Sequence, residues 1–375
     1  MSVVEKYEDV FLCVENGKIV EFLDHKPRST NLFLQGDLVL PGFVDCHTHI
    51  PFYGYREKDF LRRAFGLSYS QIHESGGGIY ESVSKLREAT IDELIRFNLS
   101  LVNNFLTKGV TTIECKTGYG LDEQNELKQL RTIEILKSVS PIDMIPTFMG
   151  AHAIPKSFNQ QDYTDYLIKI LDLLKDKCDF VDIFCDLGAF DTYNTERYLT
   201  AATEKGFKVR IHANELSNMG AVKIAVKLKA VSADHLLKLN EEDIELLSQS
   251  DTIAVLMPTT SFYLNENYAP ARRLIDSGVA AALASDFNPG SSPVLEPSLV
   301  MNLAVRFLKM SPKEVLTAYT LNSACVLGVA DRSGTIEVGK DADFVIYKEA
   351  DLETVMYLVG IIPKYVVKRG QIFEN

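Results

Sequence analysis

The chain has 375 residues, 46% apolar and 24% charged, which is ordinary for a globular protein with one large domain and a small one. The formal net charge of −12 argues against a nucleic-acid partner, because no broad basic surface exists to meet phosphates. The first ten residues are acidic without an apolar core, and no segment approaches the roughly 18 apolar residues of a membrane-spanning helix. We therefore expect a cytoplasmic protein, in which the six scattered cysteines are reduced.

Short strands are predicted at both ends of the chain. The segments with this pattern are 10–14, 18–22, 334–339, 342–347 and 364–370. Asn16-Gly17 separates the first two segments and is typical of a tight hairpin turn. Neither end supplies enough strands to bury a face by itself, so we predict one small β-sandwich domain formed by residues 1–42 together with residues 328–375.

Between these ends, apolar strand segments alternate with helical segments. Eight segments are predicted to be buried strands: 39–46, 110–115, 144–148, 180–184, 208–212, 230–233, 252–256 and 280–284. Amphipathic helices are predicted between them, for example at 91–106, 123–138, 163–175, 195–205 and 217–227. Eight such units predict an α/β fold, a (β/α)8 TIM-type barrel over residues 43–327. The alternative is an open doubly wound sheet, but no glycine-rich phosphate turn follows the first strand.

Polar residues gather where the predicted strands end. In a barrel of this type, the carboxyl ends of the strands form the rim that carries the chemistry. Five of the seven histidines follow predicted strands: His47, His49, His152, His212 and His235. Glu215 and Asp286 follow the fifth and eighth strands. Each residue alone has an ordinary explanation, such as a hydrogen-bonded histidine or a turn-capping carboxylate, but together they predict one site.

The residue types at this rim predict a metal centre. His47 and His49 are two positions apart in an extended segment, so their side chains share a face. With His212 and Asp286 they offer three nitrogens and one oxygen, a set that suits Zn²⁺ best and also allows iron. One position is left for water, whose pKa such an ion lowers toward about 7.

Two further residues are placed to move protons. Glu215 can carry a proton to a leaving nitrogen, and His235 can sit against the water as a base or electrostatic partner. The fourth strand ends in Phe184-Cys185-Asp186 without a lysine. A lysine-bridged pair of metal ions is therefore a poorer prediction than a single ion.

The segment 41–49, with the later His212, His235 and Asp286, resembles the amidohydrolase superfamily of metal-dependent hydrolases. Further segments resemble one branch of it, which opens a cyclic amide in histidine degradation: 54–57, 74–79, 116–121, 150–155, 212–215 and 284–293. The resemblance covers nearly the whole chain. Two departures are mild: Asp186 stands where the family has glutamate, and Thr117 stands where it usually has serine.

The resemblance implies roles for named residues. The metal ligands are His47, His49, His212 and Asp286. The catalytic residues are Glu215, His235 and Asp286. The substrate contacts are Arg56, Tyr119, His152, Glu215, Asn288, Gly290 and Ser291. The resemblance also implies one Zn²⁺ or Fe²⁺/Fe³⁺ ion per subunit and a homodimer.

The implied reaction is hydrolysis of 4-imidazolone-5-propanoate to N-formimidoyl-L-glutamate. The substrate is a small molecule with a carboxylate tail, which suits the planar donor fork of Arg56. Tyr119 and His152 can donate hydrogen bonds to the same tail. Asn288, with backbone groups around Gly290 and Ser291, can bond the ring.

Two other functions remain open at this point. An aminohydrolase acting on a purine or pyrimidine ring would use the same metal ligands, but a neutral base needs no carboxylate partner such as Arg56. A non-catalytic binding protein on the same barrel would be expected to lack a ligand or an acid, and none is missing. Fold alone does not decide among these, because barrels of this kind host many functions.

Overall fold

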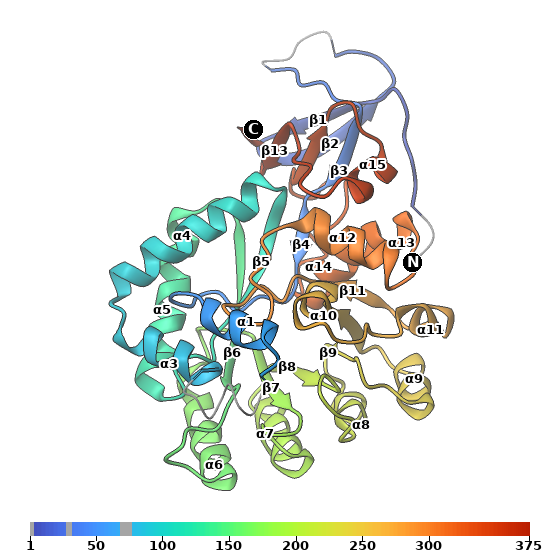
Figure 1. The fold of residues 1–375 in the computed structure, drawn as a ribbon. Coiled ribbons are helices and arrows are strands. Elements are labelled where there is room, and N and C mark those ends of the chain that lie inside the picture. The colour runs from blue at the N-terminus through green and yellow to red at the C-terminus, as the bar shows by residue number, and fades with distance from the viewer. Residues whose placement is uncertain (1–3, 28–31, 68–76) are drawn as a thin grey trace.

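The structure, a computed structural model, describes residues 4–27, 32–67 and 77–375. An 8-stranded parallel sheet curls into a barrel in the order β11-β10-β9-β8-β7-β6-β5-β4 and is surrounded by helices (Figure 1). Its strands are β4 (Phe43–Asp45), β5 (Val110–Lys116), β6 (Asp143–Ala151), β7 (Phe180–Cys185), β8 (Lys208–Ala213), β9 (Ser232–His235), β10 (Ile253–Leu256) and β11 (Ala281–Leu283). The predicted (β/α)8 barrel is therefore confirmed, although β9 begins two residues later than expected.

The helices follow the strands in chain order. They are α1 (Glu57–Ala64), α3 (Ile79–Glu88), α4 (Ile91–Thr107), α5 (Glu123–Val139), α6 (Gln160–Ile170), α7 (Thr192–Glu204), α8 (Ala221–Lys227), α9 (Glu241–Ser248), α10 (Pro258–Leu264), α11 (Ala271–Asp276), α12 (Pro297–Arg306), α13 (Pro312–Thr317), α14 (Ser323–Val326) and α15 (Leu352–Tyr357). A 3-10 turn, η1 (Leu171–Leu173), extends α6, and a π-helical turn, η2 (Ala318–Asn322), joins α13 to α14. Among the described residues, these helices are too short or too polar to cross a membrane.

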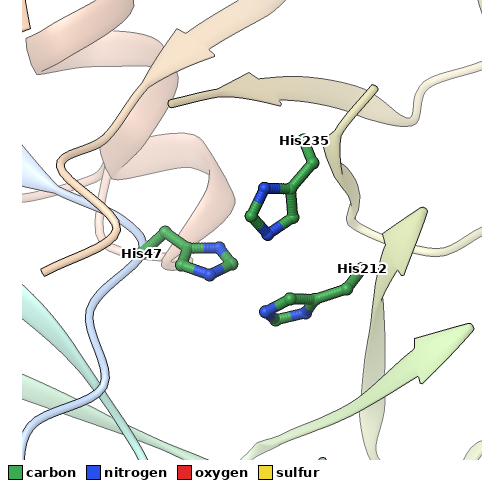
Figure 2. Close-up of side chains that lie close together, drawn as sticks. All are labelled: His47, His212 and His235. Carbon is green, nitrogen blue, oxygen red and sulfur yellow. The ribbon is translucent and has the colours of Figure 1, made fainter. Parts of the chain in front are cut away.

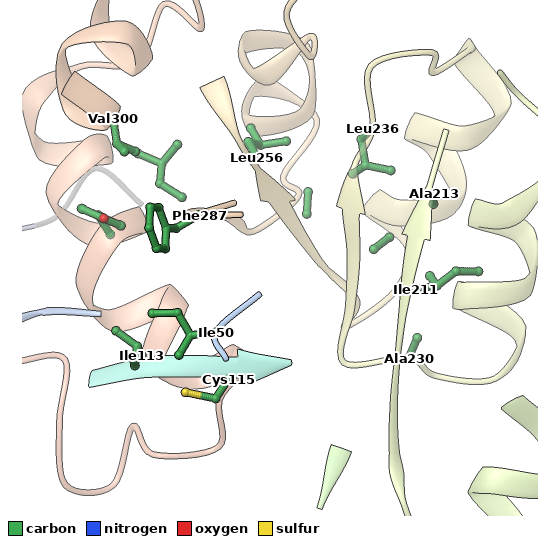
Figure 3. Packing of buried hydrophobic residues seen from close by; sticks show 14 of the residues in the cluster. Ile50, Ile113, Cys115, Ile211, Ala213, Ala230, Leu236, Leu256, Phe287 and Val300 are labelled. Atoms are coloured by element: carbon green, nitrogen blue, oxygen red, sulfur yellow. The ribbon is translucent and has the colours of Figure 1, made fainter. Parts of the chain in front are cut away.

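The ring closes between its first and last strands just beyond their ends. Thr48 and Phe287 form a parallel bridge, and the His49 N–H donates to the Phe287 carbonyl oxygen at 2.9 Å. Phe287 is fully buried with Ile50 and Ile113 in the main hydrophobic cluster (Figure 3). Closure therefore brings the segments that carry His49 and Asp286 side by side.

The predicted strand over 39–46 is wrong in one respect, because the chain changes sheets inside it. β3 (Leu38–Pro41) pairs with the C-terminal segment of the small domain, whereas β4 belongs to the barrel. Between them, the Gly42 N–H donates to the Asp343 carbonyl oxygen at 2.9 Å. A Cβ on Gly42 would lie 2.4 Å from the Thr111 side chain, so glycine permits this close crossing.

The small domain is built from both ends of the chain, as predicted. Its four-stranded antiparallel sheet has the order β14-β13-β12-β3, with β12 (Phe344–Tyr347), β13 (Tyr365–Lys368) and β14 (Gln371–Glu374). The hairpin of β1 (Phe11–Glu15) and β2 (Lys18–Leu23) shares a hydrophobic cluster with this sheet. The exact domain limits, 1–42 with 328–375 and 43–327, stay predictions.

One predicted terminal strand is wrong and another was missed. Residues 334–339 form turns, since Gly334 and Gly339 both adopt the left-handed region with φ of +86° and +92°. β14, which the sequence reading omitted, follows a turn at Gly370 and completes the sheet edge.

Gly42→Ala is expected to lower the free energy of unfolding by about 1–3 kcal/mol, because the added methyl group overlaps Thr111. Urea denaturation measures the loss. The same change in a Thr111→Ala background should cost less, since two of the three overlapping atoms are then absent. Equal losses in the two backgrounds would show that the crossing does not depend on this contact.

Candidate active site

The five histidines predicted for the rim lie together at the carboxyl ends of the barrel strands. The ring of His47 lies 4.5 Å from that of His212, 5.3 Å from His49 and 5.5 Å from His235, measured between centroids. The His152 ring stacks on His49 at 4.9 Å. Figure 2 shows His47, His212 and His235 turned toward one another. Residues that are far apart in sequence thus form one cluster.

Two overlapping groups within this cluster have the spacing of metal ligands. In each group, the ligand atoms lie within 4.8 Å of one another: His47, His212 and His235 in one, and His47, His49 and Asp286 in the other. The Asp286 carboxylate lies 3.1 Å from His49 Nε2 and 3.5 Å from His47 Nε2. All predicted ligands are therefore gathered around His47.

The polar atoms at the centre of the cluster fit a metal ion. Within the described part of the chain, His47 Nε2, His212 Nε2 and Asp286 Oδ1 are buried and make no hydrogen bond. Buried polar atoms are normally paired, so several unpaired nitrogen and oxygen atoms close together fit a site that could hold a cation. Burial lowers the pKa of both His47 and His49 well below the usual range, which keeps the neutral, ligating form of each ring.

Two carboxylates that sequence reasoning did not assign fix the orientation of the ligands. His47 Nδ1 lies 2.6 Å from Asp234, and His212 Nδ1 lies 3.2 Å from Asp182. A carboxylate accepts, so each Nδ1 carries the proton and each Nε2 is free to ligate. The sequence carries a signal for Asp182, an acidic residue inside the otherwise apolar strand β7, but a weaker one for Asp234, because β9 also contains Ser232 and His235.

These carboxylates belong to a buried ionic network inside the barrel. Its members are Glu114, Lys116, Asp182, Arg210 and Asp234, all fully buried. Lys116 Nζ lies 2.9 Å from Glu114 and 2.6 Å from Asp182. Arg210 lies 2.7 Å from Asp234 and also contacts Glu114. Asp182 and Asp234, which contact His212 and His47, are therefore connected to each other through Lys116, Glu114 and Arg210.

Carboxylates outnumber cationic side chains among these buried groups. Three carboxylates face two cationic side chains, and the nearby Asp286 adds a fourth carboxylate. Four negative and two positive charges leave a net charge of −2 when all are ionised. A divalent metal ion would neutralise it, and buried charge is costly unless it is compensated.

The backbone turns sharply where the site residues leave their strands. Asn214, His235 and Asp286 all adopt the left-handed region, with φ of 54°, 79° and 51°. Such conformations are uncommon outside glycine and cluster at functional sites, where the surrounding structure holds them. After these turns, the His235 ring lies 5.5 Å from the His47 ring, and the Asp286 carboxylate lies 3.5 Å from His47 Nε2.

Glu215 lies beside this cluster on the loop after β8. Its carboxylate is 3.6 Å from His235 Nε2, and 14% of its side chain is exposed. Burial, followed by the negative charges of Asp286 and Asp186, raises the pKa of Glu215 well above its usual range. The protonated form is thus favoured. Burial lowers the pKa of His235 to about 3, so its ring is neutral.

Arg56 lies against the loop that carries Gly290. The Arg56 N–H donates to the Pro289 carbonyl oxygen at 2.9 Å, and a Cβ on Gly290 would fall 1.7 Å from the guanidinium. The Arg56 side chain is largely buried, and within the described residues its Nε atom makes no hydrogen bond. A buried guanidinium with spare donors is suited to a carboxylate ligand.

The amide of Asn288 holds its own loop. Its oxygen accepts from the N–H groups of Gly290 at 2.8 Å and Ser291 at 2.7 Å. Its nitrogen donates to the Ser291 hydroxyl at 2.8 Å and to the Asp286 carbonyl oxygen at 2.7 Å. All four hydrogen-bonding positions are therefore used, and a substrate would replace one of these bonds.

Tyr119 and His152 line the cluster on the side of His49. Their rings are 5.3 Å apart, and His152 Nδ1 lies 3.2 Å from the Gly118 carbonyl oxygen. Because a carbonyl only accepts, Nδ1 carries the proton. Burial also lowers the pKa of His152 well below its usual range, so its Nε2 is an acceptor. Another segment of the family resemblance, 74–79, lies partly outside the described residues.

Known proteins match both this fold and this chain. Residues 167–373 match the amidohydrolase family. An imidazolonepropionase from Kosmotoga olearia is 42% identical over 364 residues, which covers 96% of this chain and 90% of that protein. Another, from Caldanaerobacter subterraneus subsp. tengcongensis, is 40% identical over 371 residues, covering 96% and 89%. A zinc-bound adenosine deaminase from Xanthomonas campestris shares the fold, with a TM-score of 0.72, 19% identity and coverage of 98% and 88%.

The barrel and its buried histidine–aspartate cluster thus define a hydrolase of the amidohydrolase family with a metal-binding site. Many enzymes share that description, and a fold match at 19% identity does not distinguish among them. Identity of 40% or more over 96% of the chain identifies the branch of the family: the chain belongs to the imidazolonepropionases.

Asp234→Asn and Asp182→Asn are each expected to weaken metal retention by roughly 10–100-fold, since each removes the negative charge that orients a histidine and makes it a stronger ligand. Competition with a chelator, followed by metal analysis, measures the effect. Asp165→Asn is the matched control, because Asp165 pairs with Arg197 at the surface. Equal retention in all three variants would contradict a supporting role for the buried carboxylates.

Proposed function

We propose that this protein hydrolyses the cyclic amide of 4-imidazolone-5-propanoate to N-formimidoyl-L-glutamate, the third step of histidine degradation. The single observation that carries this function is the match to imidazolonepropionases at 42% identity over 96% of the chain. The geometry supports it independently, because a buried guanidinium stands beside a metal-binding cluster. That pairing suits a substrate with both a carboxylate tail and a reactive ring.

The residues proposed to hold the metal are His47, His49, His212 and Asp286. Their unpaired buried atoms and neutral imidazoles support this set. We expect one Zn²⁺ or iron ion per subunit, because three nitrogens and one oxygen suit either ion. When bound, the ion supplies a Lewis acid that lowers the pKa of water and polarises the ring carbonyl.

Arg56 and Tyr119 are proposed to bind the propionate tail. The Arg56 guanidinium can meet both carboxylate oxygens, and its position is set by contact with Gly290. Burial raises the pKa of the Tyr119 hydroxyl, so this group stays a donor. When the propionate tail is bound, the ring is held next to the cluster, and its reacting carbonyl is thereby oriented.

Glu215 and His235 are proposed to move the protons. Glu215, held in its protonated form, donates to the ring nitrogen as the carbon–nitrogen bond breaks. The neutral His235 accepts a hydrogen bond from the attacking water, and Asp286 assists in removing a proton from that water. His152 presents an acceptor nitrogen, which is suited to an N–H group of the ring.

Purified protein is expected to consume freshly prepared 4-imidazolone-5-propanoate, observed as loss of its ultraviolet absorbance. A chelator should abolish the reaction, and re-added zinc or iron should restore it. Glu215→Gln should lower kcat by roughly 10²–10⁴-fold, the range for a positioned proton donor. Ammonia release from guanine or cytosine by metal-loaded protein, without imidazolone turnover, would favour an aminohydrolase instead.

Arg56→Ala is expected to lower kcat/KM, with a loss of transition-state stabilisation of about 2–4 kcal/mol, because the carboxylate tail of the substrate loses its charged partner. Gly290→Ala should have the same direction of effect, since the methyl group displaces the guanidinium. Arg131→Ala is the control, because Arg131 pairs with Glu134 on the exposed surface of α5. Unchanged steady-state kinetics in Arg56→Ala would rule out the proposed tail contact.

A further inference from the structure

Asp186 is a buried acid at the end of β7, and its carboxylate accepts five hydrogen bonds. The N–H groups of Glu215 at 2.9 Å and Leu216 at 2.8 Å donate to Oδ2. Oδ1 accepts from the Ser217 N–H at 2.9 Å, the Ser217 hydroxyl at 2.6 Å and the Leu187 N–H at 2.7 Å. Three consecutive backbone groups of one loop thus converge on one side chain.

The surroundings of Asp186 show that this acid is dedicated to the loop. Its residue is 1% exposed, and in the part of the chain that the structure describes it pairs with no lysine or arginine. Its charge is compensated by four N–H groups and the Ser217 hydroxyl. An acid in this position would be a poor choice for stability alone, because burial of an unpaired charge is costly.

The first of the three anchored residues is Glu215. β8 ends at Ala213, the next residue turns through the left-handed region, and the backbone N–H of Glu215 then meets Asp186. The strand therefore fixes the chain before Glu215, and Asp186 fixes it from Glu215 to Ser217. Between these supports, the Glu215 carboxylate is held 3.6 Å from His235.

We propose that Asp186 is a positioning residue, which holds the backbone of Glu215 so that its side chain reaches the leaving nitrogen. This inference rests on the function proposed above. Without the Asp186 carboxylate, three backbone N–H groups lose their acceptor and the loop is free to move away from the cluster. Asp186 itself touches neither the predicted metal ligands nor the reacting atoms.

A double-mutant cycle with Glu215→Gln tests the proposal. Asp186→Ala should lower kcat by roughly 10²-fold with a smaller change in KM, the loss expected when a catalytic group is misplaced by about 1 Å. In the Glu215→Gln background, the same change should cost less than about threefold, since the group that it positions is already inactive. Equal losses in the two backgrounds would overturn the proposal.

Amide hydrogen exchange supplies a readout that needs no substrate. In Asp186→Ala, exchange at residues 215–217 should accelerate by about tenfold or more while the barrel strands stay protected. Asp186→Glu keeps a carboxylate and should recover both exchange protection and most of kcat. Unchanged exchange at 215–217 in Asp186→Ala would overturn the anchoring. Asp186→Asn, which keeps one acceptor oxygen, replaces Asp186→Ala if the latter does not fold.

Asp191→Ala is the matched control from the same loop. Asp191 caps α7 by accepting from the Asn194 N–H at 2.8 Å, so its loss should lower the melting temperature and leave kcat unchanged. If wild-type protein does not hydrolyse the imidazolone, the proposed function fails while the exchange result still reports on the anchor. If it does, and Asp186→Ala matches the control, the positioning role alone is overturned.

Discussion

The candidate site depends on carboxylates that are buried inside the barrel and bonded to the ligand histidines. Asp234 accepts from His47 and also contacts Arg210, so the histidine and the barrel interior share one acceptor. Removing Asp234 would leave the buried His47 N–H without its acceptor and Arg210 with Glu114 as its carboxylate partner, and an unpaired buried group costs more than the bond itself contributes. The same arrangement that orients the imidazoles also leaves an excess of negative charge beneath them. A divalent cation bound at the cluster would offset that charge.

The loops around the rim are held by a repeated device, a buried acid that accepts backbone N–H groups. Glu126 on α5 accepts from Gly118, Gly120 and Leu121 and thereby fixes the loop that carries Tyr119. Asp45 at the end of β4 accepts from the Ser285 N–H at 3.1 Å, one residue before Asp286. Loops are ordinarily the mobile parts of a barrel, but catalytic geometry tolerates little displacement. Hydrogen bonds to acids on helices and strands hold these loops in place, so that residues on a loop can keep a fixed geometry.

Much of this arrangement could be predicted from sequence because it depends on local periodicity and on strand ends. Apolar segments predicted all eight barrel strands, and the polar residues that follow these segments predicted which residues lie at the rim of the barrel. The errors arose where one segment serves two neighbours. The segment 39–46 has a continuous apolar pattern, yet Gly42 transfers it from one sheet to the other. At this point Gly42 packs closely against Thr111, which lies about seventy positions away, so the sequence near Gly42 gives no local signal of the change of sheet.

The class of fold, the residues able to bind a metal and the resemblance to a family could all be recognised in the amino-acid sequence. These follow from residue type, spacing and motif, which are properties of short segments. The three-dimensional structure was needed to show which nitrogens of His47 and His212 bond to Asp234 and Asp182. It was also needed to show that the Asn288 amide hydrogen-bonds within its own loop. Each of these is a pairing between distant strands or a choice among hydrogen-bond partners. Such pairings are set by barrel closure, which brings together side chains that the linear chain keeps apart.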